Sequence, residues 1–199
     1  MAGMTSSWDT AYTGAEAAPW DIGMAQPAFA RLADAGLLAG RLLDVGCGTG
    51  ENTLLAAGHG AEATGVDIAP AAIERARAKA AARGLSARFE VGDVLSLALP
   101  GLADTIIDSG LFHVFSDDDR PRYVASLRAA LRPGGTLYLM CFSDRQPGEF
   151  GPRRVSLDEL EAAFADGWTV ESITADTFEI NPVGEFRQAL AWLAAIRRG

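Results

Sequence analysis

The sequence predicts a doubly wound α/β fold, and three observations lead to it. Short apolar strands alternate with helical patterns from about residue 41 to residue 142. A glycine-rich turn follows the first of these strands, where such folds bind ligands. The chain has 199 residues, of which 49% are hydrophobic, and this suits one domain with a substantial core.

Helices and strands are expected to alternate from residue 25 to residue 142. The predicted order is a helix at 25–38, a strand at 41–46, a helix from 51 to 58–60, a strand at 62–67, a helix at 70–84, strands at 87–93 and 105–110, a helix at 117–131 and a strand at 136–142. Pro70 near the first position of its helix and Gly84 just beyond its end are typical boundary residues. Such alternation indicates parallel strands joined by right-handed crossovers, with helices on both faces of the sheet.

The C-terminal part has a different character. Residues 156–165 are helical, and Ser156 and Glu159 have the spacing of a capping box. Residues 168–180 have the Thr, Val, Ile and Trp content of a long strand. Residues 186–198 are rich in Ala and Leu, which favours a helix, but no earlier strand would then pair with 168–180. We therefore predict a last strand, antiparallel to its neighbours.

Composition limits the partners and the location. A polar, Trp-containing leader at 1–24 is expected to lie over one continuous domain at 25–199. The 26 acidic residues outnumber the 17 basic ones, so nucleic acid and membrane surfaces are unlikely partners in charge terms. Cys47 and Cys141 lie in apolar stretches and resemble no metal-ligand pair, so they are expected to be reduced buried thiols, which indicates the cytoplasm. The N-terminal residues do not have the pattern of a signal peptide, and no apolar run has the length of a membrane span. The oligomeric state stays open.

Three glycines with the pattern G-x-G-x-G follow the first strand, at Gly46, Gly48 and Gly50. They permit unusual backbone angles and the close approach of a ligand. Asp67, 21 residues after Gly46, has the position of an acid that binds ribose hydroxyls. Glu51 stands where a dinucleotide fingerprint has its third glycine, and an acid there opposes a pyrophosphate. It suits a ligand with positive charge, such as S-adenosylmethionine with its ammonium and sulfonium groups.

Four motifs in order give a more specific signal than the glycines alone. LLDVGCGTGEN, GVDIAP, VGDVLSL and LRPGGTLYL resemble the motifs of the class I S-adenosylmethionine-dependent methyltransferases over nearly the whole chain. APWDIGMAQPAF together with GCGTGEN resembles the small-molecule branch, which includes thiopurine, thiol, halide and heterocycle methyltransferases. The resemblance implies a Rossmann-like sheet of seven strands whose last strand is antiparallel, with S-adenosylmethionine as cofactor.

The resemblance also implies a set of cofactor-binding residues. These are Trp20, Asp44, Gly46, Cys47, Gly48, Gly50, Asp67, Ile68, Gly92, Asp93, Val94 and Ser109. Asp67 would bind the ribose hydroxyls, although an acid before Pro70 can also cap a helix. Asp93 would accept from the adenine amine or only form a turn. Asp44 would either attract the methionine ammonium or support the glycine turn by hydrogen bonding, and both interpretations stay open.

A second set is expected at the methyl acceptor. Phe112 and His113 follow the fourth strand and should face the acceptor, whereas Trp8, Tyr12 and Trp20 of the leader could close over the sulfonium and exclude water. His113 is the candidate general base, with a hydrogen-bonded loop histidine as the alternative. Trp168 and Trp192 are expected in the core.

The functional hypothesis is methyl transfer to a thiol, hydroxyl or ring nitrogen of a small, heterocyclic or xenobiotic molecule. In-line displacement from an activated donor requires positioning in a dry cavity and little covalent machinery. This fits a sequence without a Ser–His–Asp or Cys–His arrangement. The alternatives are a cofactor-binding module without catalysis, a protein methyltransferase, and an oxidoreductase, which Glu51 disfavours.

Overall fold

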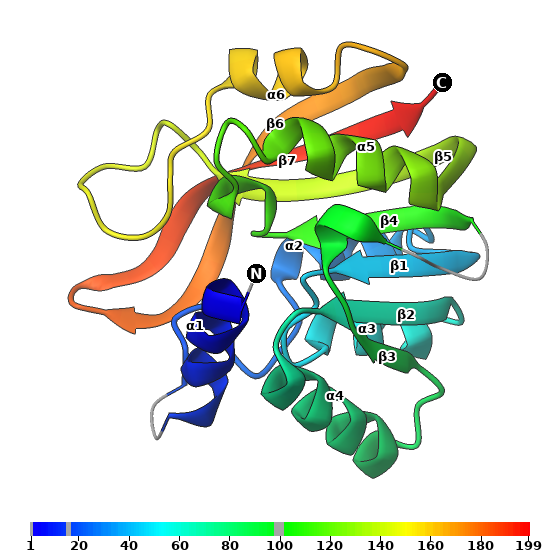
Figure 1. Ribbon diagram of the computed structural model, residues 1–199, viewed down its shortest axis with the longest axis vertical. Coiled ribbons are helices and arrows are strands. Elements are labelled where there is room, and N and C mark those ends of the chain that lie inside the picture. Colours follow the sequence, from blue (N-terminus) through cyan, green and yellow to red (C-terminus); the bar gives the residue numbers. More distant parts are fainter. Residues whose placement is uncertain (1, 15–16, 98–101) are drawn as a thin grey trace.

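A seven-stranded sheet with helices on both faces forms the body of the protein (Figure 1). The computed structural model describes residues 2–14, 17–97 and 102–199. The strands are β1 (Arg41–Val45), β2 (Glu62–Asp67), β3 (Arg88–Val91), β4 (Ala103–Ser109), β5 (Leu131–Phe142), β6 (Trp168–Val183) and β7 (Phe186–Arg198). The helices are α1 (Ala2–Thr13), α2 (Pro27–Asp34), α3 (Glu51–Gly58), α4 (Pro70–Arg83), α5 (Arg120–Ala130) and α6 (Leu157–Ala163), with short 3-10 turns η1 (Val94–Ser96) and η2 (Phe112–Val114).

The sheet has the strand order β3-β2-β1-β4-β5-β7-β6, and its first five strands are parallel. Apolar residues alternate along these strands and bury both faces. On one face, Leu42 and Ile107 pack with the helices α2 and α3, and on the other, Leu43 and Ile106 pack with α5 and α6. The predicted doubly wound α/β class is confirmed.

The last strand is confirmed in spite of its helical composition. β7 pairs antiparallel with β5, where Leu139 lies opposite Ala194, and antiparallel with β6, where Ile173 lies opposite the same Ala194. The segment is thus a central strand, and its small and branched apolar side chains pack between two neighbours. Pairing satisfies its backbone groups on both edges, which outweighs local helix propensity.

The start of β5 differs from the prediction, whereas the predicted cap of α6 is confirmed. β5 begins at Leu131 instead of residue 136, because Leu131 pairs with Ala103 ahead of an irregularity in the register and the Pro-Gly-Gly segment joins the strand. The predicted capping box is present, since the Ser156 hydroxyl accepts from the Glu159 N–H and the Glu159 carboxylate accepts from the Ser156 N–H.

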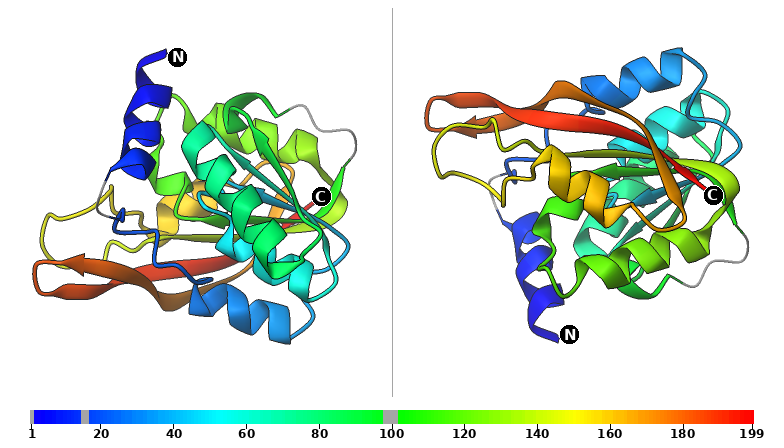
Figure 2. Two further views of the ribbon diagram at one scale, coloured as in Figure 1. Left: turned by 90° about the horizontal axis from the view of Figure 1, so that it is seen from below. Right: turned by 90° about the horizontal axis from the view of Figure 1, so that it is seen from above.

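The leader contains a helix that the polar composition did not indicate. Tyr12 at the end of α1 is buried and packs with Ala69 and Ala72, which begin α4. Figure 2 shows that α1 and the hairpin of β6 and β7 project at the same end of the molecule. No helix in residues 2–14, 17–97 or 102–199 combines the length and apolar character needed to cross a membrane.

Candidate active site

A cavity of about 630 Å³ lies where the parallel strands end. Its wall includes Gly46 after β1, Asp67 at the end of β2, Gly92 after β3, Ser109 at the end of β4 and Phe142 at the end of β5. Ligands bind at this edge in doubly wound folds. The structure therefore brings predicted site residues of β1, β2, β3 and β4 to one place, where Phe142 of β5, which was not predicted, joins them.

Most of the predicted site residues line this cavity. They are Trp8, Tyr12, Trp20, Gly46, Cys47, Gly48, Gly50, Asp67, Ile68, Gly92, Asp93, Val94, Ser109 and His113. Asp44 and Phe112 do not belong to the wall. The cysteine at position 47 is a free thiol, and burial raises its pKa well above the ordinary value. Cys141 is also free and lies in the core, as predicted.

The glycine turn adopts the left-handed backbone that its sequence indicates. Gly48 and Gly50 have φ angles of 53° and 85°, which side-chain-bearing residues rarely adopt. A Cβ at Gly48 would lie 2.9 Å from the Tyr12 hydroxyl, and a Cβ at Gly50 would lie 2.7 Å from the Phe89 ring. The groups that approach these glycines closely belong to the protein itself, and at Gly48 the group comes from the leader.

Asp67 supports two backbone turns and lines the cavity. One carboxylate oxygen accepts from the Gly48 N–H at 2.8 Å, and the other accepts from the Ala69 N–H at 2.9 Å. Burial raises the pKa of Asp67, while these backbone bonds act in the opposite direction. Each oxygen has a second lone pair, and the residue lines the cavity. The residue therefore supports the turns and keeps acceptor capacity for a ligand.

Asp93 resembles Asp67 in this respect. Its carboxylate accepts from the Leu95 N–H at 2.9 Å and caps the 3-10 turn η1, while the residue lines the cavity. The turn places Gly92 and Val94 on the same wall. The predicted contacts of Asp93 with an adenine amine and of Val94 with its ring stay predictions.

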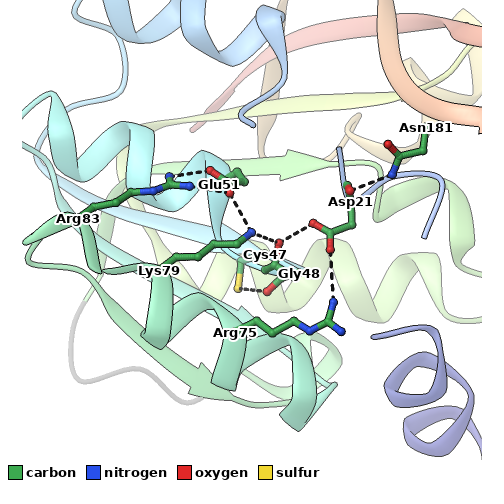
Figure 3. Close-up of polar contacts among 9 residues, drawn as sticks. Asp21, Cys47, Gly48, Glu51, Arg75, Lys79, Arg83 and Asn181 are labelled. Atoms are coloured by element: carbon green, nitrogen blue, oxygen red, sulfur yellow. Dashed lines mark hydrogen bonds and ion pairs between the residues drawn. The ribbon is translucent and has the colours of Figure 1, made fainter. Parts of the chain in front are cut away.

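Glu51 is held by basic residues of α4, which corrects the role expected for its charge. Its carboxylate oxygens lie 2.8 Å from the Lys79 ammonium and 2.7 Å from the Arg83 guanidinium (Figure 3). These partners lower the pKa of Glu51 although burial opposes them. Because Lys79 and Arg83 compensate the carboxylate, it joins α3 to α4 instead of offering an unpaired charge to a ligand.

The three leader aromatics form one cluster at the cavity. The indole N–H of Trp20 donates to the Tyr12 hydroxyl at 2.8 Å, and the Trp20 ring meets Trp8 edge-on at a centroid distance of 5.6 Å. Trp20 keeps 47% of its surface exposed. Burial raises the pKa of the Tyr12 hydroxyl, so this group stays protonated at neutral pH.

Two polar residues that the sequence did not indicate, Thr49 and Asn181, attach the leader to the rest of the site. The Thr49 hydroxyl of the glycine turn donates to Asp21 at 2.6 Å and accepts from Lys79 at 2.6 Å. The Asn181 amide on β6 donates to the backbone carbonyls of Ala18 and Asp21 at 2.8 and 2.9 Å (Figure 3). Positions 21, 49 and 181 are far apart in sequence, and no local pattern connects them.

Asp44 is a support of the fold rather than a wall residue. It is almost fully buried in β1, and one oxygen accepts from the Thr53 hydroxyl of α3 at 2.6 Å. Its other oxygen has no partner among the described residues. Burial is the main cause that raises its pKa to about 7. Asp44 thus bonds to α3 and not to the glycine turn itself, and both interpretations of its role stay predictions.

Phe112 was predicted to face the acceptor, and this is wrong. The residue is completely buried and packs its ring near Tyr123 and Phe164, with the Arg120 guanidinium 4.6 Å from the ring centroid. The 3-10 turn η2 directs neighbouring residues to different sides, so Phe112 enters the core while His113 reaches the cavity.

His113 lines the cavity, but its hydrogen bonding does not suit the role of general base. Its Nδ1 accepts from the Phe142 N–H at 3.0 Å. A neutral imidazole with an accepting Nδ1 carries its proton on Nε2, and burial is the main cause that lowers the pKa of His113 to about 3. Nδ1 is occupied and Nε2 already holds a proton, so in this arrangement His113 offers an N–H and no proton-accepting atom.

An aromatic and aliphatic wall completes the half of the cavity beyond His113. Phe142 ends β5, while Phe178 and Ile180 stand two positions apart on β6 and therefore on one face of that strand. Phe150 joins them, with its ring edge-on to Phe142 at 6.1 Å. The sequence predicts β6 as a strand, but it was not predicted to contribute to the site. The spacing of Phe178 and Ile180 places both on one face of that strand and could have indicated an apolar wall.

The charge of the wall is one-sided. Within the described ranges the lining includes six acids and neither Lys nor Arg; the acids are Asp21, Glu51, Asp67, Asp93, Asp119 and Glu179. Asp21, Glu51 and Asp119 have basic partners outside the wall, whereas Asp67, Asp93 and Glu179 have none among the described residues; these three acids fit a ligand with ammonium and sulfonium groups. In the same ranges no group of three or more His, Cys, Asp or Glu residues could hold a metal ion.

Comparison with known proteins gives consistent results. Residues 42–135 match the family model described as "Methyltransferase domain". The chain is 38% identical over 160 residues to the 2-heptyl-1-hydroxyquinolin-4(1H)-one methyltransferase of Mycobacteroides abscessus, which covers 78% of this chain and 70% of the relative. It is 29% identical over 184 residues to a probable thiol methyltransferase 2 of Arabidopsis thaliana, covering 90% and 79%.

Among the solved structures that are similar over almost the whole chain, one has 40% sequence identity. It comes from work on the conversion of a disulfide bond into a thioacetal group during echinomycin biosynthesis, has a TM-score of 0.89 and covers 98% of this chain and 93% of the other. The matched part therefore includes the leader region and the C-terminal hairpin as well as the glycine turn.

Proposed function

We propose that this chain, which belongs to the S-adenosylmethionine-dependent methyltransferases, methylates a thiol, hydroxyl or ring nitrogen of a small apolar molecule. The observation that carries the proposal is the single cavity, in which the glycine turn and Asp67 share a wall with the aromatic residues Phe142 and Phe178. A cofactor half and an acceptor half are thus continuous. The relatives named for a hydroxyquinolinone and for thiols support small acceptors.

The cofactor half is proposed to hold S-adenosylmethionine through Asp67, Asp93 and the backbone of the glycine turn. Asp67 is assigned to the ribose hydroxyls because it lines the cavity and each of its oxygens retains a second lone pair. Asp93 and Val94 are assigned to the adenine. Trp8, Tyr12 and Trp20 are proposed to cover the sulfonium, where aromatic faces attract a cation and exclude water.

The chain itself contributes position, dryness and charge. When bound, S-adenosylmethionine supplies a methyl group on a sulfonium sulfur that is already an activated leaving group. The glycine turn and Ser109 fix one end of the reaction line, and the aromatic wall fixes the acceptor at the other. The leader is proposed to act as a lid over residues 25–199, since Asn181 and Thr49 attach it to both halves.

The free thiols of Cys47 and Cys141 and the excess of acidic residues support action in the cytoplasm on a small molecule rather than on nucleic acid.

The test has two arms. Calorimetry should give binding of S-adenosylmethionine and S-adenosylhomocysteine and no binding of NAD. Labelled methyl transfer should then appear with members of a panel of aryl thiols, N-hydroxy heterocycles and azoles, and not with a peptide mixture. Cofactor binding without transfer to any small acceptor would contradict the proposed function and indicate a binding module, whereas methylated peptides would indicate a protein methyltransferase.

A further inference from the structure

The orientation of His113 is fixed by the backbone of β5. Strand pairing holds the Phe142 N–H in place, and this donor points at Nδ1 of His113 from 3.0 Å. An N–H cannot donate to a nitrogen that carries its own proton, so the bond requires an unprotonated Nδ1. The proton of the neutral ring is therefore on Nε2.

The surroundings of the ring keep it neutral and leave Nε2 without a partner in the described part of the chain. Phe142 and Phe178 meet the imidazole edge-on at 5.1 and 6.2 Å. The charged groups that act on it are Arg120 of α5 and Arg154 of the segment before α6, and both oppose a second positive charge. Nε2 has no hydrogen-bond partner among the described residues, whereas the residue lines the cavity beside Gly110.

The six acids of the described wall already have hydrogen-bond or ion-pair partners within the protein. Three of the six acids are paired with basic side chains: Glu51 with Lys79 and Arg83, Asp119 with Arg122, and Asp21 with Arg75 beside the Thr49 hydroxyl. Asp67 and Asp93 accept from backbone N–H groups, and Glu179 accepts from Gln188. Each of the six carboxylates is thus engaged with a donor of the protein, whereas the Nε2–H of His113 has no acceptor among the described residues.

We propose that His113 selects the acceptor by donating a hydrogen bond from Nε2 to the attacking atom, and that the acceptors are molecules whose attacking atom has a free lone pair at neutral pH. An ionised aryl thiol, an acidic N-hydroxyl or an unprotonated ring nitrogen meets this condition. The inference rests on the proposed function and adds the class of acceptor. An alcohol or alkyl thiol that must first lose a proton finds no base here.

The transfer balances without a proton passing to the protein. The lone pair of the acceptor forms the new bond to the methyl carbon, and the carbon–sulfur bond of the donor breaks with its electron pair on sulfur. An ionised thiol thereby becomes a neutral thioether. Because the wall is acidic, the Nε2–H of His113 is a needed donor for a partly negative attacking atom.

The first test reads the tautomer directly and needs no acceptor. In ¹⁵N-edited NMR of the full chain, His113 should show a protonated Nε2 and an unprotonated Nδ1 and should not titrate between pH 5 and pH 8. His59, the other histidine, is the internal control. Its Nδ1 faces the Leu55 carbonyl and its pKa is raised by that bond and by Asp34, so it should titrate in this range. A titrating His113, or one protonated at Nδ1, would overturn the inference.

The second test separates an ionised acceptor from a protein base. For a series of substituted thiophenols, kcat/KM should rise tenfold per pH unit up to the pKa of each acceptor and then level off, so the break moves with the acceptor. A break at one pH for the whole series would reveal a base on the protein and refute the proposal. If no acceptor is methylated at all, the proposed function fails first, while the NMR result still reports on His113.

A variant pair tests the hydrogen bond itself. His113→Leu should lower kcat/KM for ionised thiols by roughly 10- to 100-fold, the range for a hydrogen bond to a charged group, with unchanged cofactor affinity. His113→Gln, which retains an N–H donor, should recover part of the rate, and His59→Gln should match the parent protein. Full activity of His113→Leu, or no difference between Leu and Gln, would count against the donor role. If either variant fails to fold, the two tests on the parent protein still decide.

Discussion

The Thr49 hydroxyl donates to the Asp21 carboxylate across 2.6 Å, and this bond joins the glycine turn to the leader. Lys79 donates to the same hydroxyl from α4, so Thr49 is the middle member of a chain of three side chains. Asp21 also lies 3.9 Å from Arg75 (Figure 3). The position of the leader over the cavity is therefore coupled to the conformation of the turn beneath it.

Replacing Thr49 by Val keeps the shape and removes the hydroxyl. A hydrogen bond to a charged group contributes roughly 1.5 to 3 kcal/mol. We therefore expect the population of molecules with an open leader to rise at least tenfold. Limited proteolysis should cut within residues 17–24 at least tenfold faster, and cofactor affinity should fall. Thr174→Val, which removes an exposed hydroxyl on β6, is the matched control. Equal cleavage of both variants would contradict the coupling.

The sheet could be predicted because its signals are local. Apolar runs between Pro, Gly and acidic boundaries define the first five strands, and the strand at 186–198 follows from the need of 168–180 for a partner. The helix α1 could not be predicted in this way. It is polar over much of its length, and its contacts with Ala69 and Ala72 are made by Tyr12 at its end.

The candidate site divides in the same way. Glycine spacing and Asp67 are properties of one turn and its neighbouring strand, so the sequence located them. The attachment of Asn181 to the leader joins residues about 160 positions apart, and only the folded chain brings them together. The role of His113 depends on a backbone N–H of β5, which no side-chain pattern reveals.

Asp67→Asn tests the ribose assignment. The amide can accept only one of the two backbone bonds and cannot offer a charged acceptor, so affinity should fall by about 1.5 to 3 kcal/mol. Calorimetry should show this loss with S-adenosylmethionine and equally with adenosine, because both contain the ribose. Asp34→Asn, at an exposed carboxylate beside His59, should bind like the parent protein. An unchanged affinity for adenosine would reduce Asp67 to a support of the turns.

The raised pKa of Asp44 predicts that the stability of the fold depends on pH. Its pKa is raised from 3.8 to about 7 by burial, so between these values the folded state retains a proton that the unfolded chain releases. The free energy of unfolding must then fall as pH rises through this window. Asp44→Asn cannot ionise, and its stability relative to the parent protein should rise by about 2 to 4 kcal/mol from pH 4 to pH 8. Urea denaturation at several pH values measures this, with Asp166→Asn on the surface as control; a constant difference would contradict it.

Asn181→Asp tests whether the hairpin holds the lid. The Asn181 amide nitrogen donates to the carbonyls of Ala18 and Asp21. In the variant a carboxylate oxygen takes the place of this nitrogen and repels both carbonyls. The Asn181 backbone bond to Pro19 remains, so the leader should loosen without unfolding of β6. Hydrogen exchange of the leader backbone at residues 17–24 should accelerate at least tenfold, since an unsatisfied buried polar group costs about 1 to 3 kcal/mol. Trp20 emission should shift to the red as its ring leaves Trp8 and Tyr12. Thr174→Asp introduces a carboxylate on the exposed part of β6, away from the leader contacts, and should leave leader exchange unaltered. Equal protection of the leader in both variants would show that Asn181 does not hold it closed.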